Sequence, residues 1–238
     1  MSLIGSDTML AHPDIVAKAN ATPANRAGSF ENLFVKQGLY TSIVKRGLDL
    51  VLVALSLPFV LPLIGICAVL ILMTGNSPFY RQERVGKNGR RFGMWKLRTM
   101  SADADQQLKA YLAKNPEARR EWQVYQKLRK DPRILPVGRL MRKLSIDELP
   151  QILNVVAGEM SIVGPRPMLP EQQPLYPGLA YYALRPGLTG YWQISDRHNG
   201  SFAERADHDA SYAKDISLRT DVAVIASTVR VVMRGTGC

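Results

Sequence analysis

Residues 50–73 read LVLVALSLPFVLPLIGICAVLILM, a run of 24 residues without a charged side chain. At about 1.5 Å per residue, a straight helix of this length would cross a hydrocarbon layer of about 30 Å. The run is also longer than the usual helix of a soluble domain, which has about 11 to 12 residues. These properties predict a membrane helix and disfavour the alternative, a buried helix in a soluble core.

Two prolines and the flanking charges indicate how this helix meets the membrane. Pro58 and Pro62 each lack a backbone N–H and crowd a carbonyl in the preceding turn, so we expect a bend near Pro58. Lys45 and Arg46 precede the run, and seven Lys or Arg residues follow it between residues 81 and 98, against a single acid. Basic flanks stay on the cytoplasmic side. We therefore predict a re-entrant helix that enters and leaves by one leaflet, with a single kinked span as the alternative.

The apolar run divides the chain into a flexible tail (1–38), a membrane segment with an interfacial lead-in (39–76) and a cytoplasmic domain (77–238). The net charge of +11 suits an anionic membrane surface or nucleic acid, and each basic residue near such a membrane contributes about 1 kcal/mol. The two cysteines provide no disulfide framework, which fits a reducing cytoplasm.

The downstream domain is predicted to be mainly helical with one short β-hairpin, which places the fold in the α+β class. Strands at 79–85 and 91–97 are joined by a turn containing Asn-Gly, which supplies the positive φ that tight turns need. Two surface helices are expected at 101–114 and 117–130. Residues 221–234 have the spacing of an amphipathic helix, which would lie on the membrane or pack against the core.

Local signals refine the ends of these elements. Ser101 is expected to cap the helix at 101–114. Residues 164–167 and 185–190 are rich in Gly and Pro, so both are expected to be loops. Arg166 lies between two prolines in the first loop, where it is either a structural residue or a rigidly held phosphate ligand.

An acidic pair, Asp147 and Glu148, follows a strongly basic span at 119–143. Ser145 with Glu148 matches a capping box, although Asp147 would be the cap if Pro150 lies in the first turn. Either start places both carboxylates at the positive end of a helix, where an anion finds backbone donors. The pair could simply cap the helix. It could also do chemistry, with one carboxylate attacking phosphorus and the other binding Mg²⁺.

Six longer motifs occur in order along the chain. They are Lys45-Arg46-x-x-Asp49, Gln82-x-Arg84-x-Gly86, Lys96-Leu97-Arg98-Thr99-Met100, Arg142-x-x-Ser145-x-Asp147-Glu148-Leu149-Pro150-Gln151, Gly158-Glu159-Met160-Ser161-x-Val163-Gly164-Pro165-Arg166-Pro167 and Arg185-Pro186-Gly187-x-Thr189-Gly190. Over about residues 40–234 the sequence resembles the bacterial sugar transferase family, the monotopic polyprenyl-phosphate hexose-1-phosphate transferases. Within that family it is most similar to the galactosyl-phosphate transferases that start exopolysaccharide synthesis.

The resemblance implies a reaction at the cytoplasmic face of the bacterial inner membrane. A UDP-sugar would give its sugar-1-phosphate to polyprenyl (undecaprenyl) phosphate and release UMP. By this resemblance Asp147 is the nucleophile, which holds the phosphosugar covalently, and Glu148 binds Mg²⁺. The sugar is galactose or glucose, and residue spacing does not distinguish the two. Downstream glycosyltransferases are further candidate partners, nucleic acid is not, and the oligomeric state is left open.

The resemblance also suggests roles around the substrates. Lys96, Arg98, Arg142 and Arg166 would surround the phosphates. Gln193 and Arg197 would lie nearer the nucleotide, although Asp196 stands where the family commonly has glycine.

The family bends its membrane helix at a Ser-Pro pair, and this chain has Leu57-Pro58 there, so Pro58 would bend it alone. Two other classes of function are compatible with a basic, membrane-anchored chain, namely nucleic-acid binding and a non-catalytic scaffold.

Overall fold

The computed structural model describes Val35 and residues 38–101, 103–125, 128, 131–195 and 202–233. Apart from Val35 and Gly38, the predicted tail and Arg197 lie outside these residues. The helical elements, with η marking a 3₁₀ or π helix, are η2 Tyr40–Val44, α3 Lys45–Leu72, η3 Lys87–Gly89, α4 Ala104–Lys114, α5 Pro116–Tyr125, α6 Pro136–Lys143, η4 Ile146–Gln151, α7 Ile152–Val156, η5 Pro170–Leu175, α8 Ala180–Ala183, α9 Tyr191–Ile194, α10 Arg205–Asp215 and α11 Leu218–Met233. The strands are β1 Phe79–Val85, β2 Arg91–Leu97, β3 Ser161–Val163 and β4 Gly187–Thr189.

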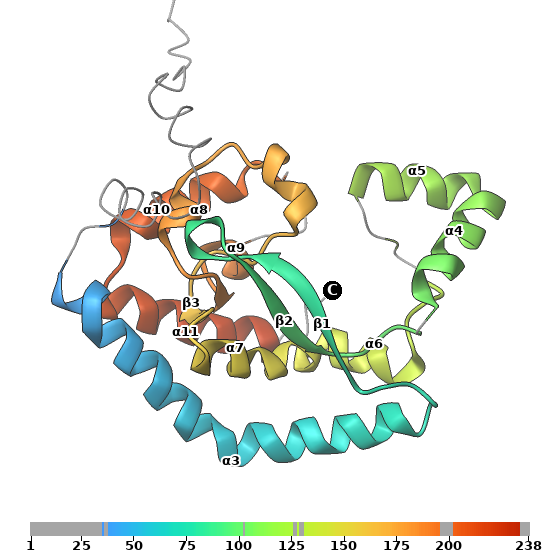
Figure 1. The fold of residues 1–238 in the computed structure, drawn as a ribbon, viewed down its shortest axis with the longest axis horizontal. Coiled ribbons are helices and arrows are strands. Elements are labelled where there is room, and N and C mark those ends of the chain that lie inside the picture. The colour runs from blue at the N-terminus through green and yellow to red at the C-terminus, as the bar shows by residue number, and fades with distance from the viewer. Residues whose placement is uncertain are drawn as a thin grey trace, which may run out of the picture.

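The apolar run forms α3, which changes direction about midway along its length (Figure 1). Together with η2 it makes a helix of 33 residues that is long and apolar enough to cross a membrane. Pro58 and Pro62 lie in its middle, and Ser56 Oγ donates to the Val53 carbonyl at 2.8 Å. Such a back-bond from a serine adds to the bending that a proline causes. Ser56, two residues before Pro58, is therefore a second bending signal, which the Ser-Pro pattern does not contain.

One face of α3 packs along the rest of the molecule, and the other is uncovered. Val53 contacts a cluster containing Phe92 and Val155, and Ile71 contacts a second cluster containing Leu97. On the opposite face Phe59 is 79% exposed, and only 17% of the most apolar window of the helix is buried. This low burial argues against the buried helix of a soluble core, the alternative that the sequence disfavours.

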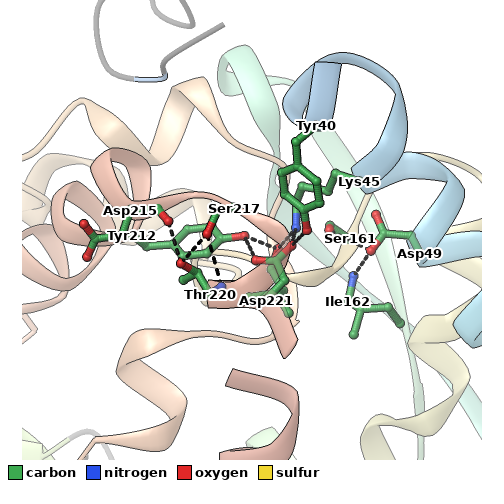
Figure 2. Close-up of polar contacts among 11 residues, drawn as sticks. Tyr40, Lys45, Asp49, Ser161, Ile162, Tyr212, Asp215, Ser217, Thr220 and Asp221 are labelled. Atoms are coloured by element: carbon green, nitrogen blue, oxygen red, sulfur yellow. Dashed lines mark hydrogen bonds and ion pairs between the residues drawn. The ribbon is translucent and has the colours of Figure 1, made fainter. Parts of the chain in front are cut away.

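Polar contacts tie the beginning of α3 to the carboxyl-terminal half of the chain (Figure 2). Lys45 Nζ lies 2.6 Å from Asp221 Oδ2 on α11, and Tyr212 OH donates to Asp221 Oδ1 at 2.7 Å. Asp49 Oδ1 accepts bonds from Ser161 Oγ at 3.0 Å and from the Ile162 N–H at 2.9 Å. The first turns of α3 are thus joined to α11 and β3.

The next basic residue, Arg46, holds the end of another helix. Its guanidinium donates to the carbonyls of Val155 at 2.6 Å and Val156 at 3.0 Å, at the carboxyl end of α7. A cation there satisfies carbonyls that have no partner within the helix. The two basic residues that suggested a cytoplasmic flank therefore also dock α3 onto the domain.

The predicted hairpin is confirmed. β1 and β2 pair antiparallel, with Phe79 opposite Leu97 and Val85 opposite Arg91. Asn88 and Gly89 in the turn have φ of 58° and 72°, as the Asn-Gly signal indicates.

A second small sheet was not predicted. β3 and β4 pair in parallel, although residues 185–190 were expected to be only a loop. Glycines allow the two segments to approach closely, because a Cβ on Gly187 would lie 2.2 Å from the backbone nitrogen of Gly164. The short helices α6 and α10 were also missed.

The two predicted surface helices are present as α4 and α5, which stand to one side of the molecule (Figure 1). They meet at Asn115-Pro116, as expected. The prediction that Ser101 caps α4 is wrong, because the helix starts at Ala104 without a side-chain cap bond. Ser101 instead donates its N–H to the Arg133 carbonyl, beside the Met100–Ile134 bridge.

Candidate active site

Asp147 and Glu148 lie on η4, a single 3₁₀ segment between α6 and α7. No side chain caps this segment, and Ser145 before it has a φ of 56°. Both predicted capping arrangements are therefore wrong. Pro150 has no N–H for the bond to the Ile146 carbonyl that an α-helix would require, so the tighter 3₁₀ turn suits this sequence.

Glu148 is held between two cations from distant parts of the chain. Lys96 Nζ on β2 lies 3.0 Å from Glu148 Oε1, and Arg166 Nη2 lies 3.4 Å from the same oxygen. Burial raises the pKa of this carboxyl, but the charges of Lys96 and Arg166 outweigh burial and hold the pKa at about 2. Glu148 is therefore ionised at neutral pH.

The neighbouring carboxyl is less acidic. Asp147 is only 9% exposed, and burial raises its pKa to about 6, although Lys96 and Arg142 act in the opposite direction. The negative charge of Glu148 adds to the increase. Asp147 is thus an ionised but poorly solvated carboxylate at neutral pH, which is the state that a nucleophile requires.

Arg84 and Arg205 join Arg166 in a group of three guanidinium ions that we call the arginine cluster. Burial, followed by the charge of Arg166, lowers the pKa of both Arg84 and Arg205 to about 10. The Nε atom of each is buried and has no hydrogen-bond partner within the described residues. A partly buried group of like charges with unused donors is suited to bind a polyvalent anion.

Local contacts orient these two arginines, which sequence reasoning did not assign to the site. Arg84 donates to the Pro167 carbonyl at 3.2 Å, next to Arg166. The Arg205 guanidinium lies 5.3 Å from the Trp192 ring centre and 4.6 Å from that of Phe202. Arg84 belongs to a quoted motif and could have been found there, whereas nothing in the local sequence marks Arg205.

The β-hairpin explains how Arg84 and Lys96 reach the same place. Opposed residues in an antiparallel pair project on the same face, and side chains alternate along each strand. Arg84 stands opposite Phe92, which lies four residues before Lys96 on β2, so Arg84 and Lys96 share a face. Because side chains alternate along the strands, Arg84 and Lys96 both project from the face of the hairpin that lies toward Glu148.

A buried amide fixes the hairpin to the helix that follows the acidic pair. Asn154 on α7 is 1% exposed; its Oδ1 accepts the Trp95 N–H at 3.0 Å and its Nδ2 donates to the Gly93 carbonyl at 2.9 Å. The same Nδ2 donates to Glu159 Oε2 at 2.6 Å. Asn154 thereby positions β2, and hence Lys96, relative to Glu148. In the sequence, the signal for this buried contact is a polar residue, Asn154, inside the apolar segment 152–156.

The remaining predicted residues have different positions. Arg142 lies close enough to Asp147 to affect its pKa. Arg98 instead donates to the Ser77 carbonyl at 2.9 Å and lies over the Tyr80 ring. Gln193 is 6% exposed, and neither of its amide atoms has a hydrogen-bond partner within the described residues. An unpaired buried amide of this kind is a candidate ligand contact.

The acidic pair also fits a magnesium ion that is shared with a substrate. Among the residues described, no group of three or more Asp, Glu, His or Cys side chains has a metal-binding arrangement. Mg²⁺, however, is commonly held by one or two carboxylates together with substrate phosphates. Asp147 and Glu148 supply such a donor set beside the arginine cluster.

Comparisons with known proteins show which family the chain resembles. Residues 40–235 match the family model for bacterial sugar transferases. The chain is 42% identical to the exopolysaccharide production protein ExoY of Sinorhizobium fredii over 198 residues, which cover 82% of this chain and 88% of the relative. It is 40% identical to a UDP-galactose-lipid carrier transferase of Erwinia amylovora and 39% identical to an undecaprenyl-phosphate galactose phosphotransferase of Salmonella typhimurium. Each of these two matches covers 82% of this chain but only 41% of the longer relative.

Proposed function

Because the chain belongs to the bacterial sugar transferase family and is a phosphoglycosyl transferase, we propose that it transfers galactose-1-phosphate from UDP-galactose to undecaprenyl phosphate, releasing UMP, in exopolysaccharide synthesis. The observation that carries the proposal is the ionised Asp147–Glu148 pair, held by Lys96 and Arg166 beside the arginine cluster. UDP-glucose is the alternative donor. The comparisons lend no support to the nucleic-acid-binding or scaffold alternatives.

The reaction would proceed in two displacements at one phosphorus atom. A carboxylate oxygen of Asp147 attacks the phosphorus that carries the sugar, the bond from that phosphorus to the UMP oxygen breaks, and UMP leaves with the bonding electrons. An oxygen of the lipid phosphate then attacks the same phosphorus, and the bond to Asp147 breaks. The pKa of about 6 supports this role, because it keeps Asp147 ionised without full solvation.

The arginine cluster is suited to hold the donor diphosphate. Guanidinium groups bind phosphate oxygens by paired hydrogen bonds, and the unused buried Nε atoms of Arg84 and Arg205 supply donors for them. Lys96 would add a further positive charge next to the reacting phosphorus. A bound diphosphate would also relieve the repulsion among the three arginines.

Mg²⁺ would be held by Glu148, with Asp147 close to it. When bound, the ion would neutralise negative charge on the diphosphate, as in other phosphoryl transfers. Glu148 itself orients Lys96 and Arg166, which it contacts through one oxygen.

The membrane segment is proposed to be re-entrant, with the domain at the cytoplasmic face of the inner membrane. Two features of α3 support this placement. Its beginning is bonded to α11, β3 and α7, and near its other end Ile71 packs against Leu97. A helix whose two ends dock on one polar domain, with an uncovered apolar face between them, suits insertion into a single leaflet.

The test combines nucleotide release with capture of the intermediate. Purified protein in lipid nanodiscs is given UDP-galactose or UDP-glucose with Mg²⁺, first without and then with undecaprenyl phosphate. We expect about one equivalent of UMP without lipid, a hexose-phosphate adduct on Asp147 by mass spectrometry, and turnover when lipid is added. The Asp147→Asn variant should remain membrane-bound and give neither adduct nor turnover. Normal turnover by that variant would refute the mechanism.

A further inference from the structure

A groove runs from Glu148, on the segment that carries the acidic pair, to α11. Its volume is about 220 Å³, and it lies among η4, β3, β4 and α11. The lining residues are Ser145, Glu148, Leu149, Ile162, Leu188, Thr189, Ile225, Thr228 and Val229. Another hollow, between α9 and α11, contains neither Asp147 nor Glu148. The first groove therefore reaches Glu148, the neighbour of the proposed nucleophile Asp147.

The lining of this groove is polar at one end and apolar along its length. Ser145 and Glu148 belong to the segment that carries the acidic pair, whereas five further residues contribute only hydrocarbon. The two threonines add little polarity, because their hydroxyls lie 2.6 Å apart and Thr228 Oγ1 donates to the Val224 carbonyl at 2.7 Å. A ligand with a charged head and an apolar tail would match this gradient.

The apolar end of the groove opens toward an exposed apolar edge of α11. Val229 lines the groove and is 55% exposed. Val232 and Met233, about one turn further along the same helix, are exposed as well. A lipid chain could therefore pass from this exposed apolar edge into the groove; Arg230, next to Val229 in the sequence, is exposed on the same helix.

We propose that this groove binds the first isoprene units of the polyprenyl phosphate acceptor, with the phosphate at the Glu148 end; this inference rests on the proposed function. The donor, whose nucleotide and diphosphate are polar, suits the arginine cluster instead. Each substrate would then reach Asp147 by a separate route, as a two-step mechanism through one covalent intermediate allows. The side of α11 that carries Ile225, Thr228 and Val229 would be part of the acceptor site.

A tryptophan at position 229 tests the groove. Val229→Trp places a large ring over the groove and is tolerable for folding because the position is half exposed. We expect the release of one equivalent of UMP without lipid to be unchanged, and the KM for undecaprenyl phosphate to rise at least about tenfold. Val222→Trp is the matched control, since Val222 is 53% exposed on the same helix and does not line the groove.

The outcomes separate this inference from the proposed function. If wild-type protein releases no UMP, the proposed function fails and the inference falls with it. If wild-type protein turns over and Val229→Trp has the same lipid KM as Val222→Trp, the groove assignment alone is overturned. If Val229→Trp lost UMP release without lipid to the same extent as lipid-dependent turnover, the groove assignment would also be overturned, because the damage would then lie in the donor half-reaction.

A second measurement uses the unaltered protein. A polyprenyl phosphate with a diazirine on its first isoprene unit is photolysed in nanodiscs, and the labelled peptide is identified. We expect label on α11 near Ile225 and Val229, and competition by undecaprenyl phosphate. Label on other elements would overturn the inference. Equal labelling of these residues by a diazirine phospholipid would also overturn it, because the groove would then hold ordinary acyl chains.

Discussion

Asp147 and Glu148 are neighbours in sequence but have opposite acidities. Burial raises the pKa of Asp147 to about 6, whereas Lys96 and Arg166 hold that of Glu148 at about 2. The difference in pKa comes from contacts, because among the described residues cations lie within salt-bridge distance of the Glu148 oxygens but not of those of Asp147. Two carboxylates in one turn can therefore take different roles, Asp147 as nucleophile and Glu148 as the group that orients the cations.

This difference predicts the pH dependence of the first half-reaction. As the pH falls through about 6, Asp147 binds a proton and loses its nucleophilic form, whereas Glu148 stays ionised. Single-turnover UMP release, measured without lipid from about pH 5 to about pH 8, should therefore decline on the acid side with a midpoint near 6. Binding of the UDP-sugar in the same buffers is the control and should change much less. A rate that does not vary across this midpoint would exclude Asp147 as the titrating nucleophile.

Arg205 provides a residue-scale test of the arginine cluster. Replacing it by glutamine removes one cation and its stacking on Trp192, so the KM for the UDP-sugar should rise by roughly tenfold or more. Arg205→Lys should lie between wild type and Arg205→Gln, because it keeps the charge but loses the planar fork. Steady-state kinetics at saturating lipid measures both.

The matched control for that test is Arg91→Gln on the hairpin. Arg91 is largely exposed, and its side chain is given one polar contact among the described residues, with Glu83 at 3.4 Å. Equal effects of the Arg205 and Arg91 substitutions would mean that the cluster has no specific role in donor binding.

At the scale of elements, local signals predicted the hairpin and the apolar helix, whereas contacts between distant segments were not predictable. Asn-Gly determines a turn through its own backbone preferences, so both strands of the hairpin were found with their ends. β3 and β4 are three residues each and pair across an intervening stretch, so neither has a strand signal of its own. Ser145 and Glu148 have the spacing of a capping box, which predicts the start of an α-helix, whereas the structure has a 3₁₀ turn at Asp147.

Asn154 tests whether the contact between α7 and β2 positions the site. Asn154→Ala leaves the Trp95 N–H and the Gly93 carbonyl without partners, and each such loss costs about 1–3 kcal/mol. The Tm should fall by several degrees, and kcat should fall because Lys96 is no longer held beside Glu148. Thermal unfolding and steady-state rates are measured together. Asn76→Ala, which removes only bonds to Thr74 in an exposed turn, should leave both unchanged. An unchanged Tm in Asn154→Ala would contradict this role.

At the scale of the whole molecule, the site lies where three separately predicted features meet. The hairpin supplies Arg84 and Lys96, the segment after α6 supplies the acidic pair, and the Gly-Pro loop supplies Arg166. The hairpin, the acidic pair and the Gly-Pro loop were each predictable from the sequence. The packing of one face of α3 along the domain was not. Hydrophobicity predicts that a run avoids water, and it does not distinguish burial against lipid from burial against protein.

The packing of α3 leads to a prediction about membrane topology. Ser42 and Ser77 are exposed and lie near opposite ends of the membrane segment. In a background with Cys67 and Cys238 replaced by serine, each is changed to cysteine and treated with an impermeant maleimide in sealed vesicles of both orientations. Because both ends of α3 dock on one domain, Ser42→Cys and Ser77→Cys should both react only in inside-out vesicles.

Detergent-solubilised samples are the control for this experiment, and both cysteines should react in them. Reaction of the two cysteines from opposite faces of the membrane would establish a straight span and exclude a re-entrant helix. Replacing Pro58 and Pro62 together by alanine restores two backbone donors and should straighten the helix. A fraction of that variant should then expose Ser42→Cys and Ser77→Cys on opposite faces, with lower transfer activity, because the acidic pair would no longer face the leaflet that holds the acceptor.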